Sequence, residues 1–238
     1  MPDSLAELRE SVLDANLEIA RRGLAPFTFG NVSGIDRARG LVVIKPSGVA
    51  YEALTARDLV VTDLTGVVVE GTLRPSSDLQ THLVLYRAFE AIGGIVHTHS
   101  HFATVWAQSG REIPCLGTTH ADYFHGAIPL TAPLTADEVG GDYEANTGHA
   151  IRRRFVGADP LRMPAVLVAG HASFCWGRDV GEALETASLL EEVARMAYDT
   201  VVLNATAEPI PESLLNRHFF RKHGPAAYYG QSRDASSS

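Results

Sequence analysis

The 238-residue sequence has only two cysteines, Cys115 and Cys175, and they lie far apart without forming a CxxC pair. A disulfide framework requires several cysteines at set spacings, so it is not an expected feature of this chain. Each cysteine sits in an apolar stretch, which is typical of a buried free thiol. These features predict a protein of a reducing compartment, and we expect it in the cytoplasm.

The sequence also lacks a long apolar run, a secretory leader and a basic stripe. No apolar stretch approaches the roughly 20 residues that a membrane-spanning helix requires, and the first residues, Met-Pro-Asp-Ser, lead directly into an amphipathic pattern. The net charge is −8, and lysines and arginines are scattered singly along the chain. We therefore expect neither a membrane nor a nucleic acid as a partner.

What the chain does contain is an alternation of strand and helix patterns without internal repeats or low-complexity linkers. Strands are expected at 41–44, 59–63, 67–69, 95–99 and 165–169, and helices at 77–89, 101–108, 143–155, 180–197 and 211–223. The length suits one hydrophobic core. The prediction is a single α/β domain over residues 1–231, with a central β-sheet covered by helices and a disordered tail at 232–238.

Two histidines, His97 and His99, lie two residues apart in a predicted strand. Side chains at this spacing point to the same face of a strand, so both imidazoles can approach one metal ion. His171 follows the predicted strand at 165–169, and strand ends are a usual location for sites in α/β sheets. Three histidines and an open position suit a catalytic metal, while hydrogen-bonded structural histidines are the alternative interpretation.

Three short polar segments would suit a phosphate and the hydroxyls of a sugar. Pro75-Ser76-Ser77-Asp78 precedes a predicted helix, where backbone N–H groups favour an anion, although a plain helix N-cap explains the same residues equally well. Lys45-Pro46-Ser47-Gly48 offers a cation, a hydroxyl and a glycine that lets the backbone approach a ligand. Gly30-Asn31-Val32-Ser33 is interpreted as a third polar turn.

Titratable and aromatic residues gather in two further segments. Gly117 to Tyr123 contains His120 and Asp122 in a predicted loop, and the basic stretch from His218 ends at Tyr228-Tyr229. Packing tyrosines at the end of a helix would explain the second segment as structure.

Taken together, these motifs resemble the class II aldolase/adducin family. The matching segments are Phe-Gly-Asn-Val-Ser at 29–33, Ile-Lys-Pro-Ser-Gly-Val at 44–49, Gly71 with Pro-Ser-Ser-Asp at 75–78, Gly-Gly-Ile-Val-His-Thr-His-Ser at 93–100, Gly-Thr-Thr-His-Ala-Asp-Tyr-Phe at 117–124, Leu-Glu-Glu-Val-Ala at 190–194, Lys-His-Gly at 222–224 and Tyr-Tyr-Gly-Gln at 228–231. The resemblance covers nearly the whole chain. It implies that residues 1–231 form a catalytic domain with the three-layer fold of this family.

The resemblance also implies one divalent metal ion per subunit, taken as Zn²⁺, with Mn²⁺ or Co²⁺ as alternatives. The ligands would be His97, His99 and His171, with Asp78 as a further ligand or a close neighbour. The residues that would bind the substrate and its phosphate are Asn31, Lys45, Ser47, Gly48, Ser76 and Ser77.

The family further implies a homotetramer with active sites between subunits. Asp122 and Tyr229 of a neighbouring subunit would then act as acid and base, and His218 and Arg221 match positions near that site. The family's aldolases carry Glu at the position of Asp78, so this residue favours the epimerase branch of the family.

One departure from the family pattern follows His171. Ala172 and Ser173 stand where the epimerases have Gly-Pro. This puts the local backbone angles in question, but not the histidine as a ligand.

The implied activity is the interconversion of L-ribulose 5-phosphate and D-xylulose 5-phosphate, in the setting of arabinose or ascorbate use. The C4 hydrogen is not acidic, so retro-aldol cleavage and re-aldolisation of the C3–C4 bond, through a metal-bound enediolate, replaces proton removal. Two alternatives are a sugar-phosphate aldolase of the L-fuculose-1-phosphate type and a non-catalytic adducin-like scaffold module.

Overall fold

A seven-stranded sheet forms the centre of the computed structural model, which describes residues 4–224 and 227–229. Its strand order is β4-β3-β2-β1-β5-β7-β6, and every neighbouring pair is antiparallel. The strands are β1 Gly30–Asp36, β2 Leu41–Ile44, β3 Val60–Asp63, β4 Val68–Glu70, β5 Gly94–Thr98, β6 Ala165–Leu167 and β7 Ser173–Gly177. The tail predicted at 232–238 lies outside the described residues, and the boundaries of the 1–231 domain stay a prediction.

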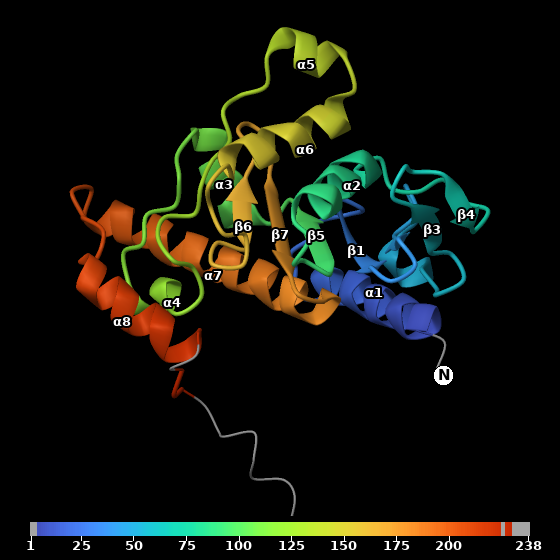
Figure 1. The fold of residues 1–238 in the computed structure, drawn as a ribbon. Helices are drawn as coiled ribbons and strands as arrows, with labels where there is room; N and C mark the ends of the chain where they lie inside the picture. The colour runs from blue at the N-terminus through green and yellow to red at the C-terminus, as the bar shows by residue number, and fades with distance from the viewer. Residues whose placement is uncertain (1–3, 225–226, 230–238) are drawn as a thin grey trace, which may run out of the picture.

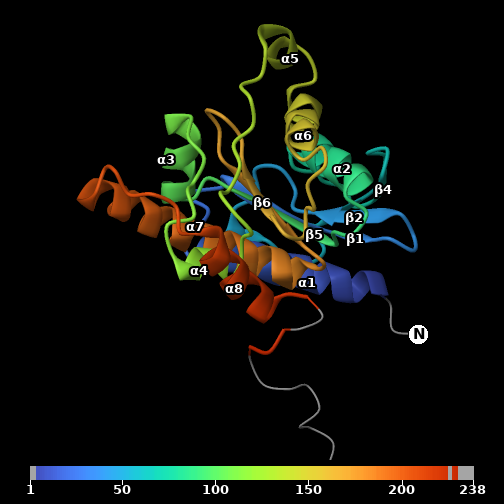
Figure 2. The same ribbon diagram turned by 60° about the vertical axis from the view of Figure 1, so that its left-hand side comes forward.

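Helices cover both faces of this sheet. They are α1 Ser4–Arg21, α2 Leu79–Ala88, α3 His101–Ser109, α4 Thr118–Ala121, α5 Ala136–Gly140, α6 Tyr143–Arg154, α7 Val180–Leu203 and α8 Glu212–Lys222, with a 3-10 turn at Tyr51–Ala53. Figure 2 shows α1 and α7 below the sheet and α2 and α6 above it, while α5 projects away from the body in Figure 1. The expected single α/β domain with a helix-covered sheet is confirmed.

Helix α7 packs closely on the middle of the sheet because two strand positions are glycines. A Cβ on Gly94 would lie 2.6 Å from the Val180 Cα, and one on Gly177 would lie 2.6 Å from the Ala183 nitrogen. Ala183, Ala187 and Ala194 are buried at helical spacing on the facing side of α7. Small residues on both partners therefore bring the helix backbone against β5, the strand that carries the histidine pair. Of the helices that the structure describes, none is long and apolar enough to cross a membrane.

The interpretation of Gly30–Ser33 as a polar turn is wrong. These residues begin β1, which pairs with both β2 and β5 in the interior of the sheet. Asn31 and Ser33 are buried, and their side chains hydrogen-bond to residues of α2 and its cap. Polar residues on a buried face remove the apolar alternation by which a strand is recognised. Strand β7, with a serine and a glycine among its five residues, was not predicted either.

Candidate active site

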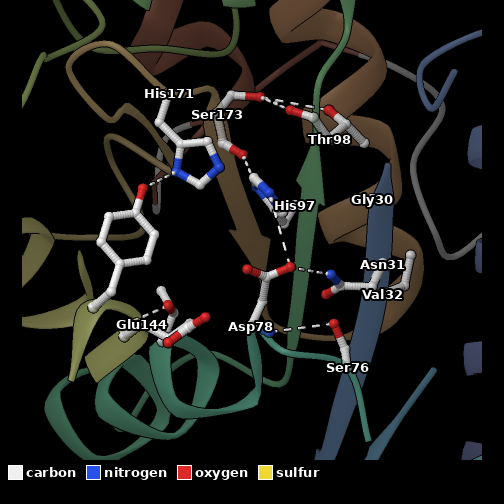
Figure 3. Close-up of polar contacts among 12 residues, drawn as sticks. Gly30, Asn31, Val32, Ser76, Asp78, His97, Thr98, Glu144, His171 and Ser173 are labelled. Carbon is white, nitrogen blue, oxygen red and sulfur yellow. Dashed lines mark hydrogen bonds and ion pairs between the residues drawn. The ribbon is translucent and has the colours of Figure 1, made fainter. Parts of the chain in front are cut away.

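Three histidines converge at one end of the central strands. His97 lies in β5, His99 follows the end of this strand, and His171 lies in the turn between β6 and β7. The pairing of Thr98 with Ser173 brings that turn beside the histidine pair. One ring nitrogen from each histidine lies within 4.8 Å of the other two. All three imidazoles can therefore bind the same ion, and Figure 3 shows His97 and His171 facing one space.

Hydrogen bonds set the orientation of these rings. His97 donates its Nδ1 hydrogen to the Ser173 backbone oxygen at 2.8 Å, so its Nε2 faces the cluster with a free lone pair. The Tyr143 hydroxyl lies 3.4 Å from Nδ1 of His171. Burial, together with neighbouring histidines, lowers the pKa of His99 and of His171 to about 4. Both rings are therefore neutral at neutral pH, which is the form that binds metal ions.

Asp78 completes the cluster from the N-terminal end of α2. It occupies the N-cap position, but its side chain makes no capping hydrogen bond, so the plain N-cap interpretation does not describe it. Its Oδ2 accepts a hydrogen bond from the Asn31 amide at 2.7 Å and lies 4.0 Å from Nε2 of His97. Burial raises the pKa of Asp78, but His97, His82 and Asn31 lower it below its ordinary value. Asp78 is therefore a carboxylate.

This donor set fits a divalent metal ion. Three imidazoles would leave an open coordination position for a water or a substrate oxygen, and a carboxylate beside them adds negative charge. The hydrogen bond of His97 to a backbone carbonyl is the outer-shell contact typical of metal-binding histidines.

The cluster opens into a cavity of about 410 Å³, which we call the histidine cavity. Its walls include every residue predicted to bind the metal or the substrate: Asn31, Lys45, Ser47, Gly48, Ser76, Ser77, Asp78, His97, His99 and His171. Backbone hydrogen bonds from Ser47 to Arg74 and from Ser76 to Lys45, both of 2.9 Å, join the two serine-containing segments. Gly48 has a φ of +70°, which a side chain would strain. Hydroxyls and a tight turn thus lie at one wall.

Lys45 is a buried cation at this wall, with a side chain only 2% exposed. Its Nζ donates to the Val49 backbone oxygen at 2.7 Å and lies 4.9 Å from the centre of the Tyr51 ring. Burial lowers the pKa of Lys45. Among the described residues no carboxylate forms an ion pair with it, so its charge suits an anionic group of a ligand.

The two predicted catalytic residues and the two residues predicted to support them form a cluster apart from the histidine cavity. The Asp122 carboxylate accepts hydrogen bonds from Arg221 at 2.9 and 2.7 Å and lies 3.0 Å from Nδ1 of His218. Burial raises the pKa of Asp122, but Arg221 and His218 lower it further than burial raises it. Tyr229 is 61% exposed and lies against Arg221, with its ring centre 4.9 Å from the guanidinium carbon. These four residues do not line the histidine cavity of their own chain.

The structure shows which backbone angles Ala172 and Ser173 adopt after His171. Among the described residues, Phe27 is the only non-glycine with a positive φ, so Ala172 and Ser173 adopt ordinary backbone angles. Ser173 begins β7 and supplies the carbonyl that orients His97. A glycine is therefore not required after His171 in this chain.

Tyr143 and Glu144 are among the residues of the cavity wall that sequence reasoning missed. They begin α6, and Thr81 of α2 holds this end by donating to the Glu144 backbone oxygen at 2.6 Å. An acidic residue in the first turn of a helix is ordinary, so the sequence carried no signal that set Glu144 apart. It is the packing of α6 on α2 that brings both residues to the cavity.

The sequence is closely similar to bacterial epimerases. It is 54% identical over 227 residues to a protein named L-ribulose-5-phosphate 4-epimerase UlaF from Salmonella paratyphi B (strain ATCC BAA-1250 / SPB7), and the match covers 95% of this chain and 100% of that protein. A protein of the same name from Salmonella typhi shows the same identity and coverage.

Solved structures share the fold at lower identity. An L-fuculose 1-phosphate aldolase superposes with a TM-score of 0.75 at 24% identity, covering 89% of this chain and 94% of that one. The l-fuculose-1-phosphate aldolase from Thermus thermophilus gives 0.66 at 23% identity, over 86% and 100% of the two chains. Residues 10–198 match the family described as Class II Aldolase and Adducin N-terminal domain. The chain belongs to the class II aldolase/adducin family.

Proposed function

We propose that this chain is a metal-dependent L-ribulose-5-phosphate 4-epimerase, which interconverts L-ribulose 5-phosphate and D-xylulose 5-phosphate. The observation that carries this proposal is the convergence of three imidazoles and Asp78 on one polar cavity that also contains a buried lysine. The 54% identity to proteins that bear this name supports it.

Substrate binding is assigned to the serine-containing wall. Ser47, Gly48, Ser76 and Ser77 would bind the phosphate with hydroxyls and backbone N–H groups, and Lys45 would supply positive charge. Asn31, whose amide contacts Asp78, would bind a sugar hydroxyl. A firm hold on the phosphate is required because the aldehyde fragment must stay bound between cleavage and re-closure.

The metal is proposed to be one zinc ion per subunit, held by His97, His99 and His171 with Asp78 beside it; manganese and cobalt fit the same donors. When bound, such an ion supplies Lewis-acid stabilisation for the negative charge that carbon–carbon cleavage leaves on the substrate.

Proton transfer is assigned to Asp122 and Tyr229. A base takes the proton of the C4 hydroxyl as the C3–C4 bond breaks, and this gives an aldehyde. After the aldehyde turns, attack on its other face forms the bond again, and an acid returns a proton to the oxygen. Two groups on opposite sides of the aldehyde are therefore required.

Both groups would come from a neighbouring subunit of a homotetramer. In their own chain they lie outside the histidine cavity, and Tyr229 is exposed, as a group serving another subunit would be. His218 and Arg221 would position Asp122. Residues 1–231 would form the catalytic domain. The predicted location stays the cytoplasm, where sugar phosphates are held.

The test is incubation of zinc-loaded protein with L-ribulose 5-phosphate, followed by detection of D-xylulose 5-phosphate. Formation of that epimer is the expected result. Accumulation of free dihydroxyacetone without the epimer would indicate an aldolase instead. Purified protein without a stoichiometric metal, and without either product, would indicate an adducin-like scaffold.

A further inference from the structure

Glu191 belongs to the segment 190–194 that matches the family pattern, and the proposed reaction gives it no role. It is a partly buried residue of α7, the long helix that packs against α3. Its two carboxylate oxygens accept hydrogen bonds from the backbone N–H groups of Phe102 and Ala103, at 2.8 and 3.0 Å. These are the second and third residues of α3. A carboxylate of one helix therefore caps the N-terminus of another.

The residue that ordinarily makes such a cap does not make it here. Ser100 occupies the N-cap position of α3 with extended backbone angles, and a serine there commonly accepts from the second or third N–H group of its helix. Its side chain makes no capping hydrogen bond, and its hydroxyl is buried without a partner within the part of the chain that the structure describes. Glu191 takes both N–H groups instead, and its negative charge suits the positive end of a helix.

The start of α3 lies beside His99, one of the proposed metal ligands. His99 follows the last residue of β5 and precedes α3 by two residues. Unlike His97 and His171, it has no hydrogen bond among the described residues that would orient its ring, which packs against the ring of Phe29. The course of the chain between β5 and α3 therefore has a large share in placing this imidazole.

The other end of α3 is joined to a second proposed ligand. The Ala107 backbone oxygen, in the last turn of α3, accepts a hydrogen bond from the Gly170 N–H group at 3.0 Å. Gly170 directly precedes His171 in the turn between β6 and β7, and its φ of +70° suits a glycine. One helix of nine residues is thus connected at its two ends to two of the three histidines.

Helix α7 is the support on which α3 is held. It lies directly on the sheet through the close approach to Gly94 and Gly177 described above. Besides Glu191, a second contact joins the two helices: the buried Trp106 donates through Nε1 to the Ala194 backbone oxygen at 3.0 Å. Figure 2 shows α3 beside α7. Trp106 holds the later part of α3, so the first turn depends on Glu191.

We propose that Glu191 is a positioning residue for the metal site. By capping α3 from α7 it holds His99, and through the far end of the helix His171, where their imidazoles can share one ion. The inference rests on the metal site of the proposed function. Without Glu191 the two N–H groups need another acceptor, and the Ser100 hydroxyl can form the ordinary cap. The start of α3 then readjusts, and His99, the residue before Ser100, moves with it.

Zinc affinity, measured by chelator competition, tests this role. We expect Glu191→Ala to bind zinc about 10-fold more weakly, the lower end of the range for outer contacts of metal ligands. The matched control is Glu192→Ala, which removes the next acidic residue of α7, paired with Arg195 at the surface, and should keep the wild-type affinity. Cobalt-loaded protein gives a second readout, because its visible absorption reports the geometry of the ligands. This spectrum should change in Glu191→Ala and not in the control.

Hydrogen exchange of the metal-free protein, followed by NMR, traces the effect along α3 without any metal. In Glu191→Ala the Gly170 amide should exchange faster, as well as the amides of Phe102 and Ala103. Unchanged exchange at Gly170 would overturn the extension of this role to His171. If Glu191→Ala does not fold, Glu191→Gln replaces it: the amide keeps one acceptor oxygen and loses the other, so a smaller loss of zinc affinity is expected.

Three results would overturn the proposal. They are a folded Glu191→Ala with wild-type zinc affinity and cobalt spectrum, an equal loss of affinity in Glu192→Ala, and a loss that follows the melting temperature alone. A wild type that binds zinc without epimerising L-ribulose 5-phosphate would disprove the proposed function, while the zinc affinities and exchange rates would still decide the role of Glu191.

Discussion

His97 is hydrogen-bonded through Nδ1 to the backbone oxygen of Ser173, its neighbour across the β5–β7 pair. The acceptor is a main-chain atom whose position is set by strand register: His97 pairs with Phe174, and Thr98 pairs with Ser173. The His97 nitrogen that would bind the metal is therefore oriented by the sheet itself and not by a side chain.

Ser173→Ala tests this relationship. Within the described part of the chain, the Ser173 hydroxyl makes only long hydrogen bonds to Thr98, at 3.3 and 3.5 Å, and the carbonyl is kept in the variant. We expect a loss of about 1 kcal/mol or less in the free energy of unfolding and an unchanged zinc affinity. A clear drop in zinc affinity would show that the side chain, and not the backbone, orients His97.

Asp122→Asn should separate chemistry from metal binding. The variant keeps the shape of the side chain but removes the negative charge that Arg221 and His218 contact. We expect kcat to fall by about 10²–10⁴-fold, the usual contribution of an acid or base, while zinc content stays at the wild-type value. Glu112→Gln, which removes the acidic partner of an exposed ion pair with Arg154, is the control and should keep full activity.

Tyr229→Phe removes one hydroxyl from an exposed ring. Turnover should fall sharply because the second proton-transfer group is lost, and zinc content should stay intact because this ring lies outside the histidine cavity. Loss of the metal in this variant would show that Tyr229 is assigned to the wrong place.

Mixing two inactive variants tests the shared site. His97→Asn lacks a metal ligand and Asp122→Asn lacks the proposed acid or base, so neither alone has a complete site. If these groups come from different subunits, an active site requires one subunit with an intact His97 and a neighbour with an intact Asp122. Each condition is met in half of the subunits of an equal mixture, so co-refolded mixtures should regain about one quarter of the wild-type sites. No recovery in mixed tetramers would place both groups in one subunit. Size-exclusion chromatography with light scattering confirms that the mixtures are tetramers.

The stability of metal-free protein should fall as the pH falls from about 6.5 toward 4. The pKa of His99 and of His171 is about 4 in the folded chain, against about 6.5 when unfolded. Between these values the unfolded chain binds more protons than the folded one, so stability rises with pH in this window. Denaturant unfolding at several pH values measures the slope, and His99→Gln should flatten it. An equal slope in that variant would contradict the assigned cause.

The sequence predicted those parts of the site that depend on local geometry. The two-residue period of a strand placed His97 and His99 on one face, and His171 was expected at a strand end. The strand with polar inward-facing residues, Asn31 and Ser33, could not be recognised because hydrophobic periodicity is the signal for strands.

Other parts of the site depend on tertiary packing. Backbone hydrogen bonds join the segments around Ser47 and Ser76, and a contact with α2 places Glu144 of α6 at the cavity. In both cases the contacting residues lie far apart in the chain. The separate cluster around Asp122 also became visible only in the structure, while the roles of its members stay predictions.

Lys45, which has no ion-pair partner among the residues that the structure describes, has a consequence for selectivity. In the ligand-free protein the Val49 backbone oxygen and the Tyr51 ring contact this ammonium group, and the burial of its charge lowers the stability of the fold. The proposed phosphate would reduce this cost by bringing a negative charge beside Lys45. If the proposed role of Lys45 holds, a phosphorylated sugar would therefore be favoured over its unphosphorylated form, since only the phosphate would bring negative charge to this buried cation.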